Sequence, residues 1–306
     1  MIRMKQLVPF LGLICLAYSG LAQKQFDLGF RAGAANYIGE IGGNGEPRPF
    51  LMDVQAAQTS PTLGTFVRWG VANRISLQAD LNFVQIRQDD AQSGDPARRA
   101  RNLHFRNQMF ETGLRADWTF LDKGRVVRET PRQRQRIGLE MAVYAGVAGV
   151  LHNPQARVLY DPLNQWSGEW HDLRPLRTEG QVESYGSLIV ALPVGVRAAF
   201  DFGHRWKLGI EATWRTTFTD YLDDISGVYA NPDQLDPLAR ALSSQAHPDV
   251  VEAVNAEFGT NLSVSNFQFS EAGTDRGNPN SNDGYGTIEI TVARVLKTRG
   301  RVVDGF

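Results

Sequence analysis

Apolar and polar residues alternate in eight stretches of the chain, most of them about ten residues long. In one of them, Leu77, Ala79 and Leu81 alternate with Gln78 and Asp80. Successive side chains of a β-strand point to opposite faces, so each stretch predicts a strand with one apolar and one polar face. The predicted strands are 26–33, 63–71, 75–85, 103–120, 137–151, 188–200, 206–218 and 285–296.

The connections between these strands alternate in length. The segments 71–74 and 201–205 are short enough for tight turns, whereas 121–136 is a longer exception. Four other connections are long, and they are 34–62, 86–102, 152–187 and 219–284. In outer-membrane barrels short turns face the periplasm and long loops face outside. The pattern therefore predicts an all-β fold, a transmembrane antiparallel up-and-down barrel of eight strands with both termini periplasmic.

Aromatic residues near the strand ends predict two interfacial girdles, as membrane barrels require. On the turn side they are Trp69, Trp118, Phe120, Phe200 and Trp206, and on the loop side they are Phe83, Phe110, Phe218 and Tyr285.

The inward-facing positions of the predicted strands carry charges of both signs. The acidic ones are Asp27, Asp80, Glu111, Asp117, Glu140, Glu211 and Glu289, and the basic ones are Arg31, Arg68, Arg115, Arg197, Lys207 and Arg215. An eight-stranded barrel is just wide enough for side chains to fill it, and an unpaired buried charge is costly. We therefore expect these charges to pair and to plug the barrel, so that it is not a pore.

Residues 1–22 have the features of a cleaved signal peptide. Arg3 and Lys5 precede an apolar run over 7–17, and small residues at 20–22 suit cleavage before a mature chain of 23–306. An uncleaved anchor is the alternative, although this run is short for a bilayer span. Cys15, the only cysteine, lies in the signal, so the mature chain has no thiol for disulfides or zinc. Together with the barrel pattern, the signal predicts the outer membrane of a Gram-negative bacterium.

The sequence offers no catalytic or cofactor-binding residues, and with a net charge of −1 no nucleic-acid partner is expected. Neither His104 nor His204 has a serine at the spacing that a lipid-modifying barrel enzyme would need. The glycines at 39, 42, 43 and 45 precede no helix, so they indicate a flexible loop and not a phosphate site. Short helices are predicted at 238–242 and 250–258.

No metal site is predicted. Asp220, Asp223 and Asp224 form an acidic cluster, but their spacing lacks the alternating ligands and central glycine of an EF-hand loop. We expect this cluster to rigidify its loop, and whether it binds a cation stays open.

The long turn at 121–136 is strongly basic and is the candidate contact surface. Its basic residues are Lys123, Arg125, Arg128, Arg132, Arg134 and Arg136. They suit the phosphate headgroups of the inner leaflet, and they equally suit an acidic periplasmic partner.

Five segments resemble the PorG-like outer-membrane proteins of the Bacteroidota type IX secretion and gliding apparatus. They are 36–42, 101–106, 172–181, 217–226 and 276–279, and the Thr-Phe-Thr-Asp-Tyr-Leu-Asp-Asp run from Thr217 is the most specific. Arg177 departs from the pattern, because a glycine is expected there.

The resemblance implies a non-enzymatic accessory component of type IX protein secretion. It also implies association with a periplasmic ring that includes a lipoprotein. The alternative interpretations are a structural or adhesion barrel of the OmpA-like type and, third, a lipid-modifying enzyme.

Overall fold

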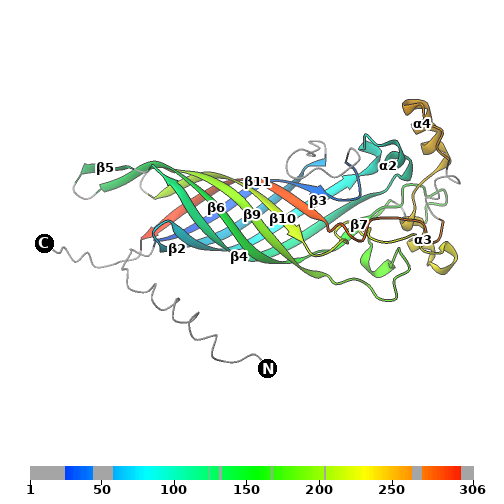
Figure 1. The fold of residues 1–306 in the computed structure, drawn as a ribbon, viewed down its shortest axis with the longest axis horizontal. Coiled ribbons are helices and arrows are strands. Elements are labelled where there is room, and N and C mark those ends of the chain that lie inside the picture. The colour runs from blue at the N-terminus through cyan, green and yellow to red at the C-terminus, as the bar shows by residue number, and fades with distance from the viewer. Residues whose placement is uncertain are drawn as a thin grey trace, which may run out of the picture.

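Eight long strands close into an antiparallel barrel (Figure 1). The computed structural model describes residues 25–43, 58–123, 125–130, 133–166, 168–202, 205–263 and 271–297, so the predicted signal peptide lies outside the described residues. The strands of the barrel are β1 (Gln25–Ile38), β2 (Ser60–Ala72), β3 (Ile75–Asp89), β4 (His104–Asp122), β6 (Gln133–Leu151), β9 (Leu188–Phe202), β10 (Trp206–Thr217) and β11 (Gly284–Lys297). Each pairs with its neighbour in the ring, and β11 pairs with β1 to close it. The predicted fold class is confirmed.

The two ends of the barrel differ, and we name them by their connections. At the turn end, β1 begins opposite the last residue of β11, with Gln25 paired to Lys297. The predicted long turn is a β-hairpin here, because β5 (Arg125–Thr130) pairs with the first residues of β6. This hairpin extends past the barrel at the turn end (Figure 1).

At the loop end, several strands continue beyond their predicted limits. β1 continues to Ile38, and β3 stays paired with β4 as far as Asp89 opposite His104. Here the side chains inside the barrel become apolar, and Ala35, Tyr37 and Ile86 in the added strand length are buried. The extra strand length therefore encloses a second, apolar core, which the alternation of a lipid-facing strand does not reveal.

The connections at the loop end form a cap of short elements. These are η5 (Asp90–Gln92), α2 (Pro96–Arg101), β7 (Pro154–Ala156), β8 (His171–Asp172), η6 (Arg174–Leu176), η7 (Pro232–Gln234), α3 (Pro237–Ser243) and α4 (Pro248–Phe258). The last two confirm the predicted helices. α2 is a helix that the sequence analysis missed, although Asp95 caps it by accepting hydrogen bonds from the amides of Ala97 and Arg98. No helix within the described residues is long and apolar enough to cross a membrane.

The outer face of the barrel is apolar, as the alternation predicts. Leu81, Leu114 and Ile210 are all more than half exposed on it. The aromatic residues predicted for the turn side are exposed there, except that Trp69 is half-buried and stacks on Phe26. An apolar exterior around a polar lumen is the arrangement of a transmembrane barrel.

The predicted loop-side girdle is wrong at one position. Phe110 and Phe218 are exposed and Phe83 is half-buried, but Tyr285 is fully buried. Its hydroxyl donates a hydrogen bond to Glu111 Oε2 at 2.7 Å. Tyr285 is an even number of residues from Glu289, an inward-facing residue, so the two-residue period of β11 places it inside the barrel.

An arginine should destabilise the barrel strongly in the middle of the outer face and only weakly near the end of a strand. We expect Ile210→Arg, near the middle of β10, to lower the free energy of unfolding by about 2–4 kcal/mol. Val71→Arg, beyond the girdle residue Trp69, should cost about 1 kcal/mol or less. Urea unfolding in lipid vesicles, followed by the gel shift between folded and unfolded forms, measures both variants. Equal losses would contradict the assignment of the outer face.

Candidate functional site

The lumen holds a network of ion pairs and hydrogen bonds. Glu211, fully buried on β10, lies 3.5 Å from Arg31, 3.3 Å from Arg68 and 3.0 Å from Arg115. Each of the thirteen charged residues predicted to face inward lies in at least one ion pair, including the weaker contact of Arg31 with Glu289 at 3.7 Å. The predicted pairing of lumen charges is confirmed.

The network fills the lumen. A cavity between Asp80, Glu111, Arg115 and Arg215 has a volume of about 10 Å³. One water molecule needs about that much space. At this level the described side chains therefore leave no room in the lumen for a substrate or a hydrated ion.

At the loop end, the first residues after β10 fold back over the barrel mouth. Leu222 and Ile225 are fully buried in the apolar core with Tyr37 and Phe105. The side-chain Nδ2 of Asn107 on β4 donates a hydrogen bond to the Leu222 carbonyl at 2.8 Å. The segment that carries the most specific resemblance thus closes the mouth of the barrel.

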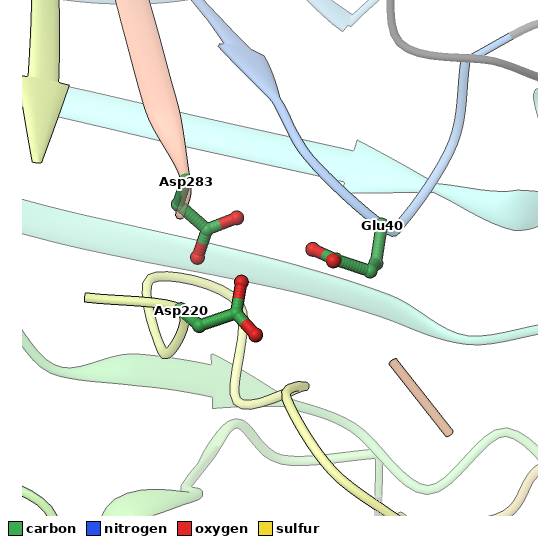
Figure 2. A group of neighbouring side chains, drawn as sticks. All are labelled: Glu40, Asp220 and Asp283. Atoms are coloured by element: carbon green, nitrogen blue, oxygen red, sulfur yellow. The ribbon is translucent and has the colours of Figure 1, made fainter. Parts of the chain in front are cut away.

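Three carboxylates from distant parts of the chain meet beside this closure (Figure 2). Glu40 follows β1, Asp220 follows β10, and Asp283 immediately precedes β11. One oxygen from each lies within 4.8 Å of the others. β11 lies between β1 and β10 in the barrel, which explains how residues so far apart in sequence come together. We call these three residues the mouth cluster.

The predicted grouping of Asp220, Asp223 and Asp224 is only partly right. Asp220 belongs to the mouth cluster, whereas Asp224 accepts hydrogen bonds from Thr178 at 2.5 Å and Tyr185 at 2.7 Å. Glu40 and Asp283 were missed, because only the order of strands in the barrel reveals their proximity to Asp220.

Burial and mutual repulsion raise the pKa values of the carboxyl groups in the mouth cluster. Burial, followed by the charge of Asp220, raises the pKa of Glu40 to about 7. Burial likewise raises the pKa of Asp220 to about 7. The pKa of Asp283 is also raised, first by burial and then by the charges of Asp223 and Glu40. Ionising all of these groups together is therefore unfavourable unless a positive charge joins them.

Hydrogen bonds in the cluster are unevenly distributed. Asp283 accepts from the Tyr37 hydroxyl at 2.5 Å and from the Leu222 amide at 2.8 Å. By contrast, neither carboxylate oxygen of Asp220 has a hydrogen-bond partner among the described residues, although the nearby Ser226 hydroxyl lowers the pKa of this carboxyl against the effect of burial. A side chain at position 39 would collide with Tyr37 and Asp283, so Gly39 is required for the chain to pass here.

The glycine segment is held in place and is not the flexible loop that we predicted. Ile41, Gly42 and Gly43 are buried, and the Gly42 amide donates to Asp90 at 2.8 Å. Gly45 lies outside the described residues. Arg101 pairs with the same Asp90 at 2.8 Å and donates to the Glu40 carbonyl at 2.9 Å. The mouth cluster therefore rests on a fixed backbone.

A second buried network ties the long loops together. Arg276 lies 3.1 Å from Glu179 and 3.6 Å from Asp224, and its Nε donates to the Ser243 carbonyl at 3.3 Å. Glu179 in turn accepts a hydrogen bond from the Ser226 amide at 2.9 Å. Arg177, where the resemblance predicts glycine, has the left-handed φ of 51° that glycine favours.

The cap also has an open cleft of about 460 Å³ beside α3. Tyr160, Trp166, Arg240 and His247 contribute to its lining. The Tyr160 ring is largely exposed and lies 4.0 Å from the His247 ring. Exposed aromatic and basic side chains in a concave surface are features of binding sites.

The basic residues of the candidate contact surface lie at the turn end. Lys123 is exposed after β4, Arg125 and Arg128 belong to β5, and Arg134 and Arg136 belong to β6. Arg132 lies outside the described residues. The pairing register sets Arg128 directly opposite Arg134.

One of the two histidines considered for catalysis lies within the described residues, and its ring contacts the backbone. The Arg157 amide donates to His104 Nε2 at 3.1 Å, and His204 lies outside the described residues.

The fold and the filled lumen together define a small, closed membrane barrel with a structured cap. A family model described as a domain of unknown function, DUF6089, matches residues 5–150. No protein of curated function matches the chain.

Three solved barrels are similar in strand arrangement. The N-terminal barrel domain of Pseudomonas aeruginosa OprF is 10% identical, covers 90% of this chain and 100% of its own, and has a TM-score of 0.33. Ail, the attachment invasion locus protein of Yersinia pestis, is 8% identical with the same coverage and TM-score. Neisserial surface protein A is 8% identical, covers 90% of this chain and 97% of its own, and has a TM-score of 0.32. At these values the fold assignment rests on the strand pairing of this chain itself.

Proposed function

We propose that this protein is a closed outer-membrane barrel that holds a structured cap at the cell surface for contact with a molecule outside the cell. This is a structural or adhesion role of the OmpA-like type. The lumen charges are all paired, so the barrel serves as an anchor and not as a channel. Long connections of outer-membrane barrels face outside, which supports this orientation of the loop end.

The observation that carries the proposal is the internal order of the cap. Long loops are ordinarily mobile, but here Arg276 and Glu179 join two of them through buried contacts. Ordering these loops costs conformational entropy. A cap that pays this cost presents a fixed surface, including the cleft beside α3, and such preorganisation favours binding.

Site-specific photo-crosslinking in native membranes tests the proposal. A crosslinking amino acid replaces Leu163, which is 74% exposed in the cap, or Ile210 on the lipid-facing side as the control. We expect protein or glycan adducts at Leu163 only, and only when partners are supplied from outside intact cells. Adducts confined to the turn end would contradict a surface role.

Accessory function in type IX secretion is the second candidate. The basic hairpin at the turn end favours it, because basic residues suit an acidic partner. The proposed partner is an acidic surface of a periplasmic ring that includes a lipoprotein. Outer-membrane lipid headgroups are the competing partner.

The same experiment, with the crosslinker at Arg128, separates the candidates. A ring protein captured at Arg128 but not at Leu163 would support secretion. Lipid adducts alone at Arg128 would assign the hairpin to the headgroups.

A further inference from the structure

The mouth cluster differs from every other group of buried carboxylates described above. In the lumen, each carboxylate lies within 4 Å of an arginine or lysine. Among the described residues, no such ion pair reaches Glu40, Asp220 or Asp283, or the neighbouring Asp223. Arg101, the nearest compensating charge of Glu40, is already engaged with Asp90 at 2.8 Å.

Unpartnered oxygens inside the cluster are the second observation. Asp220 is only 6% exposed, and its carboxylate points toward Glu40 and Asp283 (Figure 2). Both of its oxygens lack hydrogen-bond donors, as do Glu40 Oε2 and Asp223 Oδ2. Buried polar atoms are almost always satisfied, and leaving one unsatisfied costs about 1–3 kcal/mol. Three unsatisfied acceptors in the mouth cluster and a fourth on the neighbouring Asp223 indicate a ligand that is positively charged.

We propose that Glu40, Asp220 and Asp283 bind a divalent cation of the Ca²⁺ class at the barrel mouth. Carboxylate oxygens are the ligands of hard cations. Ca²⁺ binds oxygen at about 2.3–2.6 Å, so oxygens on opposite sides of the ion are about 4.6–5.2 Å apart. One oxygen from each of the three residues lies within 4.8 Å of the others, so a single ion of this size can contact all three.

Magnesium fits the cluster less well. It demands near-ideal octahedral geometry, keeps several of its waters and is usually bound by only one or two carboxylates, whereas three carboxylates meet here. The cation would link the end of β1 to the segments next to β10 and β11. This proposal does not depend on the function proposed above, since it concerns only the described side chains of the mouth.

Calorimetric titration of the full-length barrel in a non-ionic detergent, stripped with a chelator, tests the proposal. We expect one Ca²⁺ to bind with an affinity in the submillimolar range of extracellular sites, and Mg²⁺ to bind at least about tenfold more weakly. Tb³⁺ should replace Ca²⁺ and luminesce on tyrosine excitation, because the Tyr37 hydroxyl contacts Asp283. Asp220→Asn should weaken Ca²⁺ binding at least about tenfold, the loss expected when a charged ligand is removed.

Two further variants complete the test. Asp233→Asn changes a cap carboxylate whose side chain is 83% exposed, and it should bind Ca²⁺ as the unaltered protein does. Glu40→Gln changes a half-buried ligand, and it replaces Asp220→Asn as the test variant if Asp220→Asn fails to fold.

The free energy of unfolding provides a second measurement, in which the effect of Asp220→Asn should change sign when Ca²⁺ is added. Without Ca²⁺, Asp220→Asn should resist unfolding better than the unaltered protein, because it removes a repelling charge. With Ca²⁺ the order should reverse. Equal Ca²⁺ titrations in the unaltered protein, Asp220→Asn and Glu40→Gln would overturn the proposal, as would the absence of binding at millimolar Ca²⁺.

Discussion

Glu211→Ala should lower the free energy of unfolding of the barrel by about 3–5 kcal/mol, the cost of breaking a buried ion pair. Glu211 is fully buried and compensates Arg31, Arg68 and Arg115 at once. Removing it leaves three guanidinium groups close together in the lumen without the carboxylate that they share. Urea unfolding in lipid vesicles measures the loss.

Glu257→Ala is the matched control for this variant. Glu257 also pairs with an arginine, Arg99, at 2.9 Å, but its side chain is 55% exposed on α4. Exposed pairs contribute about 1 kcal/mol or less. Comparable losses in the two variants would show that the lumen is hydrated and that its charges are not mutually dependent.

Arg276→Ala should loosen the cap and leave the barrel intact. Arg276 holds Glu179, which in turn accepts from the amides of Ser226 and Gly227 at 2.9 and 3.1 Å. Breaking this buried pair should cost about 3 kcal/mol locally. Amide exchange of Ser226 and Gly227 should then accelerate about a hundredfold, since each 1.4 kcal/mol corresponds to a factor of about ten. Hydrogen exchange followed by mass spectrometry measures it.

The strand amides of β9 and β10 provide the internal control and should exchange unchanged. Arg240→Ala is the external control, because Arg240 is 60% exposed and lies 3.7 Å from an exposed Asp233. Unchanged exchange at Ser226 in Arg276→Ala would mean that the apolar core alone orders this part of the cap.

The barrel itself was predictable because its signal is local. A two-residue period assigns each strand residue to a face. A charged side chain inside a narrow barrel lies close to the other inward-facing charges, so it is expected to pair with them. The pairs of Glu211 and Glu140 therefore followed from sequence, although their individual partners did not. Tyr285 was assigned wrongly because its aromatic character was given more weight than its position in the period of β11.

The mouth of the barrel was not predictable in the same way. Glu40 and Asp283 are separated from Asp220 by long stretches of sequence, and no local pattern links them. The hairpin of β5 was missed because charged residues interrupt the alternation that identifies a lipid-facing strand. Asp95 before Pro96 was the available signal for α2, since an aspartate followed by a proline is a common helix start.

The mouth cluster also constrains the order of events in folding. The hydrogen bond from Tyr37 to Asp283 joins residues 246 positions apart, across the pair of strands that closes the barrel. Contacts between such distant residues form late, after the entropy of closing the intervening chain has been lost. An unclosed chain therefore lacks the cluster altogether. A ligand that binds the assembled mouth would therefore bind closed barrels and not incomplete ones. Binding of such a ligand would report that assembly of the barrel is complete.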